Sequence, residues 1–210
     1  MRLVIPYQHD PNGGHELRYA IRSMVKHFKS MTGVLLIGDK PKWYTGEHIQ
    51  MADVDRKEYS IMLKIKACPY EDFLFSNDDI FALKDFDHTL PNYYSSTLAA
   101  ATVYGKYVQR RDNCLTVYPN GLFYDIHTPM VINKSGYEKA NNVDWDKRDY
   151  LCKSLYGNYI GAGELLPDCK LRKPGPVPDV PFFSTSNYTS RLIPLQNMYP
   201  DASEYENDKL

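Results

Sequence analysis

The first 40 residues alternate between the patterns of a strand, a helix and a second strand, and this alternation constrains the fold more than any other feature of the chain. Residues 3–5 form a short apolar run that Pro6 ends. After a polar loop that contains two glycines, apolar residues recur at helical spacing from Leu17 to Phe28. Residues 34–37 are apolar again. Two strands joined through a helix predict a right-handed crossover within a parallel sheet.

The rest of the chain carries similar, weaker patterns. They predict strands at residues 49–51, 73–75, 80–83, 115–118, 123–127 and 129–132, and helices at residues 57–68, 95–109, 135–141 and 147–156. Five prolines between residues 167 and 181 predict an extended segment, and the acidic last ten residues are expected to fray. We therefore expect one catalytic domain over residues 1–170, with residues 171–210 packed on it or trailing from it.

The composition excludes several classes of protein. Apolar residues make up 43% of the 210 residues and charged residues 24%, which excludes a disordered chain. No apolar run is long enough to span a bilayer, and the first residues turn polar too soon for a signal peptide. With 25 Lys and Arg against 26 Asp and Glu, the net charge of −1 argues against a protein that coats DNA, although a local basic groove is compatible with it.

The cysteines indicate a reducing compartment. All four are scattered, without a CxxC pair, so the sequence predicts no structural zinc site. In the absence of a secretion signal, we expect free buried thiols and a cytoplasmic protein.

The strongest chemical signal is the end of the predicted strand at residues 73–75, which runs directly into Asn77, Asp78 and Asp79. Adjacent carboxylates repel each other unless a cation neutralises them. Their oxygens suit Mg²⁺ or Mn²⁺ that holds a diphosphate. The same three residues can instead form a turn that caps the next element. The local pattern leaves both interpretations open.

A second signal lies in the predicted strand at residues 123–127. Strand alternation places Asp125 and His127 on one face. A carboxylate beside an imidazole can orient it as a base, or both can ligate a metal. The alternative is a solvated strand face without a chemical role.

A third signal is the spacing of Arg18 and Arg22, which are four residues apart near the start of the predicted helix. Side chains at this spacing point the same way, and together with the helix dipole they could hold a phosphate. The alternative is a solvated basic face paired with Glu16. Taken together, the three signals indicate nucleotide-sugar chemistry, in which a divalent ion bridges a diphosphate and neutralises the leaving group.

Residues 16–23, 36–43 and 75–81 resemble, in order and spacing, the central block of the Stealth family. That family includes bacterial capsular polysaccharide phosphotransferases and the lysosomal-enzyme N-acetylglucosamine phosphotransferase. Residues 125–129 are similar to a later segment of the family that holds an essential His. The family's opening block is missing, and residues 4–8 resemble instead the start of inverting GT-A glycosyltransferases. The chain also resembles small uncharacterised glycosyltransferases of phages and bacteria.

The resemblance implies a GT-A-like α/β fold, a three-layer α/β/α arrangement around a mostly parallel central sheet. It also implies roles for the residues that match the motifs. Asp79 would be the principal ligand of Mn²⁺ or Mg²⁺, Asp78 a ligand or sugar contact, and His127 a second ligand or, with Asp125, the acceptor-side base. The residues that would contact the nucleotide-sugar are Pro6, Tyr7, Arg18, Arg22, Asp39, Asn77 and Asp78.

The expected function is metal-dependent transfer of a sugar from a nucleotide-sugar donor to a hydroxyl acceptor. A saccharide is the favoured acceptor, and a nucleic acid is the alternative acceptor. One alternative is a Stealth-like transfer of sugar-1-phosphate, which releases a nucleoside monophosphate. Others are a non-catalytic protein that binds nucleotides or carbohydrates, and a metal-dependent nuclease or phosphatase.

Overall fold

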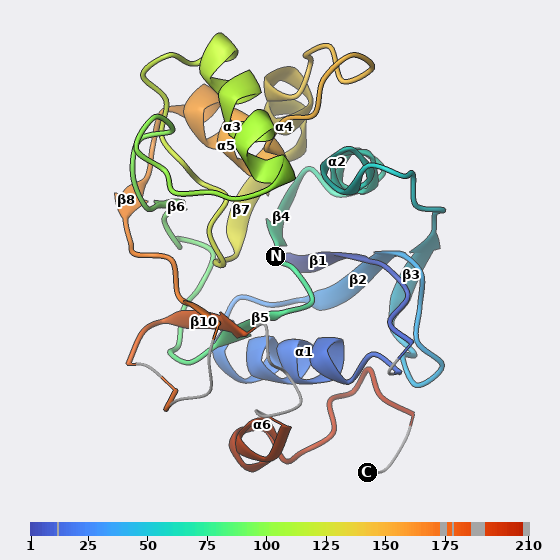
Figure 1. The fold of residues 1–210 in the computed structure, drawn as a ribbon. Helices are drawn as coiled ribbons and strands as arrows, with labels where there is room; N and C mark the ends of the chain where they lie inside the picture. The colour runs from blue at the N-terminus through green and yellow to red at the C-terminus, as the bar shows by residue number, and fades with distance from the viewer. Residues whose placement is uncertain (12, 173–175, 178, 186–191, 208–210) are drawn as a thin grey trace.

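A central, mostly parallel sheet organises the protein. The structure is a computed structural model that describes residues 1–11, 13–172, 176–177, 179–185 and 192–207 (Figure 1). Within these residues the sheet has five strands in the order β3-β2-β1-β4-β7, and only β7 runs antiparallel to its neighbour β4. The strands are β1 (Arg2–Tyr7), β2 (Gly33–Gly38), β3 (Glu47–Gln50), β4 (Asp72–Phe75) and β7 (Met130–Asn133). The predicted crossover and the parallel sheet are confirmed.

Helices cover both faces of this sheet, and two smaller sheets complete the fold (Figure 1). One small sheet has the order β5-β10-β9, and β6 pairs with β8. No helix among the described residues is long and apolar enough to cross a membrane. The further elements are α1 (His15–His27), α2 (Lys57–Lys66), β5 (Ile80–Ala82), β6 (Tyr93–Tyr94), α3 (Lys106–Val117), α4 (Lys134–Ala140), α5 (Cys152–Ile160), β8 (Glu164–Leu165), β9 (Lys170–Leu171), β10 (Phe182–Thr185) and α6 (Leu192–Met198).

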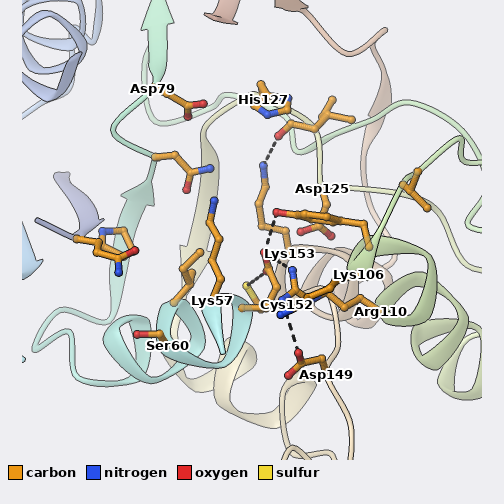
Figure 2. A pocket seen from close by; sticks show the side chains of 18 of the residues that line it. Lys57, Ser60, Asp79, Lys106, Arg110, Asp125, His127, Asp149, Cys152 and Lys153 are labelled. Atoms are coloured by element: carbon orange, nitrogen blue, oxygen red, sulfur yellow. Dashed lines mark hydrogen bonds and ion pairs between the residues drawn. The ribbon is translucent and has the colours of Figure 1, made fainter. Parts of the chain in front are cut away.

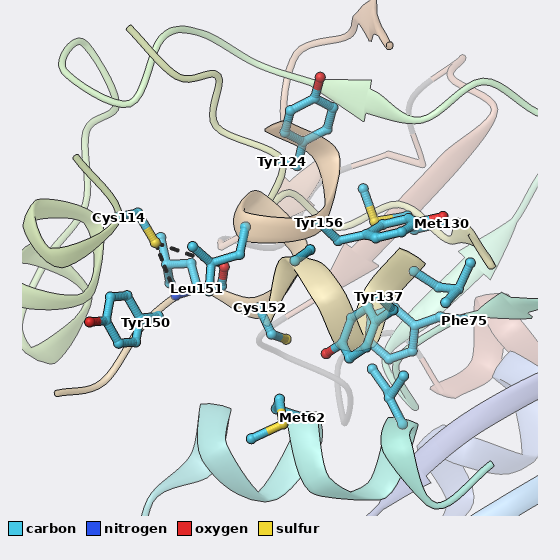
Figure 3. Packing of buried hydrophobic residues seen from close by; sticks show 14 of the residues in the cluster. Met62, Phe75, Cys114, Tyr124, Met130, Tyr137, Tyr150, Leu151, Cys152 and Tyr156 are labelled. Atoms are coloured by element: carbon cyan, nitrogen blue, oxygen red, sulfur yellow. Dashed lines mark hydrogen bonds between the residues drawn. The ribbon is translucent and has the colours of Figure 1, made fainter. Parts of the chain in front are cut away.

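Strand alternation places one apolar layer on each face of the central sheet. In β1, Leu3 and Ile5 pack with the apolar side of α1, whereas Val4 packs in the layer on the opposite face. In that opposite layer Phe75 of β4, Met62 of α2 and the ring of Tyr137 from α4 meet (Figure 3). Because both faces are covered, the inner strands read as continuous apolar runs. The three-layer α/β/α arrangement is confirmed.

The predicted helix at residues 95–109 is wrong. Backbone amides of Ser95 and Leu98 donate to the carbonyls of Phe123 and Gly121, so this segment pairs with a distant loop and not with itself. The helix α3 begins only after Gly105, whose φ of 58° favours glycine. The strand predicted at residues 115–118 is therefore the end of α3, where tertiary packing overrides local strand propensity.

Two further predicted elements are wrong in this region. Residues 123–127 form no strand, because Asp125 and the backbone of Tyr124 bond to Ser154 and not to a neighbouring strand. The helix predicted at residues 147–156 begins only at Cys152. Before it, Asp149 is held by Arg56, and this contact keeps the preceding residues in an irregular loop.

The predicted fraying of the C-terminus is wrong for residues 201–207. The ring of Tyr205 stacks on Tyr44 at 6.2 Å, and the backbone amide of Asn207 donates to the carbonyl of Trp43. The side chain of Glu206 is fully buried and accepts two hydrogen bonds of 2.8 Å from Arg22. Residues 208–210, and Pro174 and Pro178 of the predicted extended segment, lie outside the described residues.

We expect Glu206→Ala to destabilise the protein by about 3–5 kcal/mol, because it leaves a buried guanidinium without its counter-charge. The free energy of unfolding in urea measures this loss. Asp201→Ala, at an exposed position six residues before Asn207, serves as the control and should change little. Equal stability of the two variants would show that the ion pair does not anchor the C-terminus.

Candidate active site

A cavity of about 930 Å³ opens at the carboxyl ends of β1 and β4. Pro6 and Gln8 follow from β1, and Asn77 follows β4. Side chains of α2, α3 and the start of α5 form the opposite wall (Figure 2). In open α/β sheets, ligands bind outside the carboxyl ends of the strands, so this cavity is the candidate active site.

Asp78 and Asp79 both line the cavity and are half-buried. Asp79 Oδ2 accepts a hydrogen bond of 2.8 Å from Ser184 and lies 3.1 Å from Lys170 Nζ. Burial by itself raises the pKa of Asp79, but the charges of Lys170 and His127 outweigh it and hold that pKa below its usual value. No side chain among the described residues forms an ion pair with Asp78.

Negative charge accumulates at this end of the cavity. Burial, and then the charge of Asp79, raise the pKa of Asp78 to about 6. Glu16, at the start of α1, also lines the cavity. Burial, followed by the charges of Asp79 and Asp78, raises its pKa to about 8. A cation bound here would relieve this repulsion.

The predicted metal ligands fit a cation that arrives with a diphosphate. Within the described part of the chain, no three His, Cys, Asp or Glu side chains gather as a complete ligand set. Mg²⁺ is commonly held by one or two carboxylates together with substrate phosphates. Asp78 supplies one carboxylate, and Asp79 supplies its Oδ1, since Lys170 and Ser184 both contact Oδ2.

His127 is oriented by Asp168, a residue that sequence reasoning missed. Its Nδ1 lies 2.8 Å from Asp168 Oδ1, and its backbone amide donates to the same oxygen at 3.0 Å. This contact leaves Nε2 of the ring for another group, and Figure 2 shows the ring on the same side of the cavity as Asp79. A carboxylate behind an imidazole is the usual support of a His that ligates metal or moves a proton.

Asp125 lines the cavity on the side of α5, and not on a strand. The backbone amide of Ser154 donates to its Oδ2 at 3.0 Å, and the Ser154 hydroxyl bonds to the same oxygen. Burial raises the pKa of Asp125, and the nearby Lys153 opposes that rise. Lys153 Nζ in turn donates to the carbonyls of Ile126 and Thr128 at 2.7 and 2.9 Å. The carboxylate is thus fixed, and its oxygen Oδ1 is the one that Ser154 leaves unoccupied.

Of the residues predicted to contact the nucleotide-sugar, Pro6, Tyr7 and Asp39 lie in different places. Pro6 lines the cavity, whereas Tyr7 and Asp39 are not among the described residues that line it. The Tyr7 carbonyl accepts from the buried Lys64 Nζ at 2.7 Å. Asp39 Oδ2 accepts from the backbone amide of His9 at 2.9 Å and so shapes the loop that follows β1.

The structure does not bring Arg18 and Arg22 to the cavity. They are only 3% and 4% exposed, so the solvated basic face is wrong as well. Arg22 holds Glu206, and Arg18 lies over the Trp43 ring at 4.6 Å with its Nε 3.6 Å from Glu206 Oε2. At this four-residue spacing the two side chains contact Glu206 of the C-terminal segment instead of a phosphate.

Sequence reasoning missed several cavity residues. Lys57, Ser60 and Lys64 all line the cavity and recur at helical spacing on α2, a signal that could have marked this face. Asp168 and Lys170 belong to a proline-rich stretch without periodicity, so only folding brings Asp168 to His127 and Lys170 to Asp79.

Comparisons with known proteins bear on the fold. No protein-family model and no curated protein matches the chain. Among solved structures, the galactosyltransferase LgtC, in complex with donor and acceptor sugar analogues, is similar over 97% of this chain and 98% of its own, at 10% identity and a TM-score of 0.51. At this identity the similarity concerns the fold alone. The chain has an α/β fold of the GT-A type.

Two other structures are similar at lower scores. The glycosyltransferase GlyE of Streptococcus pneumoniae TIGR4 aligns with 76% of this chain at 11% identity and a TM-score of 0.41. The chain spans only 43% of the length of that structure. The 2-C-methyl-D-erythritol 4-phosphate cytidylyltransferase of Thermus thermophilus aligns with 95% of this chain and 98% of its own, at 9% identity and a TM-score of 0.49. The resemblance to the Stealth family stays a prediction.

The raised pKa of Glu16 predicts that stability depends on pH. Folded Glu16 keeps its proton up to about pH 8, whereas the unfolded chain releases it near pH 4.5, so stability falls as pH rises between these values. We expect Glu16→Gln to be more stable than the parent at pH 8 and equal to it below pH 4.5, in urea unfolding. Glu138→Gln, exposed on α4, is the control. Equal stability of Glu16→Gln and the parent at pH 8 would contradict the prediction.

Proposed function

We propose that the protein is a metal-dependent glycosyltransferase, which moves a sugar from a nucleotide-sugar donor to a hydroxyl of an acceptor saccharide. One observation carries the proposal: Asp78 and Asp79 follow β4 into a cavity whose opposite wall holds the oriented carboxylate of Asp125. The GT-A type of fold supports it. The neighbour LgtC was solved with donor and acceptor sugar analogues, which is consistent with such a pair of substrates here.

The donor would lie along the ends of β1 and β4. Pro6 and Gln8 offer a surface for the nucleoside, and Lys64 of α2 brings a positive charge to the end of β1, where its Nζ donates to the Tyr7 carbonyl. The diphosphate would then reach Asp78 and Asp79, at the end of β4. Lys57 extends into the cavity from α2 toward this region (Figure 2), and its charge acts on Asp78. This position suits a contact with a donor phosphate.

Asp78 and Asp79 are the groups that would hold Mn²⁺ or Mg²⁺ beside the diphosphate, and His127 does not gather with them into a complete ligand set among the described residues. When bound, such a cation neutralises the charge that develops on the leaving nucleoside diphosphate. Lys170 keeps Asp79 ionised for this role, because its charge lowers the pKa of that carboxyl against the effect of burial. Asp168 fixes the orientation of the His127 ring.

Asp125 would receive the proton of the acceptor. The acceptor oxygen attacks the anomeric carbon and forms the new glycosidic bond, while the bond from that carbon to the phosphate oxygen breaks and the nucleoside diphosphate leaves. The hydroxyl proton passes to Asp125 Oδ1, since Ser154 engages Oδ2. Burial raises the pKa of Asp125, and a raised pKa makes a carboxylate a stronger base.

Binding of the donor is tested by thermal unfolding with UDP-, GDP-, CDP- and dTDP-sugars, each with and without Mn²⁺. A ligand that binds only the native state raises the unfolding midpoint. We expect one nucleotide to raise it, with the shift dependent on Mn²⁺ and lost in Asp79→Asn. Asp144→Asn, at a partly exposed surface position, is the matched control. If no nucleotide-sugar shifts the midpoint of the parent, the proposed function is wrong.

Turnover tests the assigned roles. We expect Asp79→Asn to abolish transfer and Asp125→Asn to lower kcat by about 10²–10⁴-fold, as for loss of a general base. The donor-induced thermal shift should persist in Asp125→Asn, because Asp125 acts on the acceptor. Full activity of Asp79→Asn would overturn the metal site. Release of a nucleoside monophosphate, and not a diphosphate, would show the Stealth-like transfer of sugar-1-phosphate instead.

A further inference from the structure

The cavity has a second end, between α2, α3 and α5, whose charge differs from that of the strand ends (Figure 2). Lys106 and Arg110 of α3 and Lys153 of α5 line it, together with the carboxylates Glu58 and Asp149. Burial, followed by the charge of Asp125, raises the pKa of Glu58 to about 7, so this carboxyl carries only part of a charge near neutral pH. Burial also lowers the pKa of Lys153, so the positive charge at the helical end comes mainly from Arg110 and Lys106.

Arg110 is a buried cation at this end whose hydrogen bonds are only partly satisfied, although it also lies over the Tyr107 ring at 5.0 Å. Its side chain is 6% exposed, and its Nη1 and Nη2 lie 3.9 and 3.5 Å from Glu58 Oε1 and Asp149 Oδ2, longer than good charged hydrogen bonds. Asp149 is bound more closely by Arg56, whose Nε donates to it at 2.6 Å. Arg110 Nε has no hydrogen-bond partner within the described part of the chain. A buried guanidinium in this condition is costly unless an anion completes its hydrogen bonds.

Two exposed residues, Tyr104 and Lys106, line the same cavity as Arg110. Lys106 precedes it by one helical turn, so both cations lie on the same side of α3. Tyr104 lines the cavity and is nevertheless 74% exposed, the highest value among the large apolar side chains described. An aromatic ring with one wet face can stack on a sugar ring.

We propose that the acceptor is a saccharide with an anionic substituent, a carboxylate or a phosphate, which Arg110 and Lys106 bind while Tyr104 covers the sugar ring. This inference rests on the proposed glycosyltransferase function and specifies its acceptor. Arg110 is recessed and can be reached by a single substituent. A polynucleotide would need several exposed cations in a row, and the net charge of −1 offers little support for that.

Titration calorimetry with three model acceptors tests this proposal: methyl β-D-glucuronide, glucose 6-phosphate and the neutral methyl β-D-glucoside. We expect the parent to bind at least one anionic sugar about tenfold or more tighter than the neutral one. The two anionic probes distinguish a carboxylate from a phosphate. Equal affinity for charged and neutral sugars, or tighter binding of a single-stranded oligonucleotide at the same site, would overturn the proposal.

Variants locate the binding site. Lys106→Ala and Tyr104→Ala change exposed side chains and should fold normally, and each should weaken the anionic sugar about fivefold or more. Arg110→Gln should weaken it further, and Lys106→Ala decides the outcome if that variant does not fold. The matched controls are Lys139→Ala on α4 and Tyr159→Ala on α5, both exposed and outside the cavity. Loss of affinity in the controls as large as in Lys106→Ala would overturn the assignment.

The thermal shift caused by the nucleotide-sugar separates this proposal from the proposed function. Lys106→Ala and Tyr104→Ala should keep the full shift, because the donor lies at the strand ends. If these variants lose it, the two residues serve the donor and the acceptor assignment is wrong. If the parent shows the shift but no preference for anionic sugars, only the acceptor assignment fails. If the parent prefers anionic sugars but shows no shift, the transferase function fails.

Discussion

The contacts of Asp79 Oδ2 join the end of β4 to two strands from the C-terminal part of the chain, next to the point where β5 pairs with β10. Asp79 follows β4 of the central sheet, while Lys170 and Ser184 come from β9 and β10 of the small sheet. Lys170 of β9 therefore lines the cavity, and Ser184 of β10 supports this part of it through Asp79. The same contacts keep Asp79 ionised beside Asp78, whose own pKa is raised by burial and by this neighbour. Folding of the C-terminal segment and the charge state of the site are thus coupled.

The charge of the cavity changes along its length, which would suit its two ends to different substrates. The strand ends concentrate carboxylates, which favour a cation and, through it, a diphosphate. The helical end presents Arg110 and Lys106, which favour an anion directly. Asp125 lies between α5 and the strand ends, where a donor and an acceptor would meet.

The central sheet was predictable because its pattern is local. Residues 34–37 and 73–75 are continuous apolar runs, and a buried parallel strand needs little more. The elements after residue 95 were largely mispredicted, because distant partners determine them. Ser95 and Leu98 bond to residues 121–123, a contact that no local pattern encodes. The acidic residues at the end of β4 were predicted by the same local reasoning as the strand. Asp168, which orients His127, was not, because it lies 41 residues after His127 in the chain.

The fate of two predicted sites shows when a local pattern is informative. Arg18 and Arg22 had the spacing of a phosphate clamp. In the structure, however, Arg22 donates two hydrogen bonds to Glu206, which lies 184 residues later in the chain. A pair of cations attracts any suitable anion, and the chain itself supplied one. Asp78 has no such internal partner among the described residues, although it is half-buried and its pKa is raised. A charge pattern therefore indicates a ligand only where folding leaves the charge uncompensated, and Asp78 meets that condition while the two arginines do not.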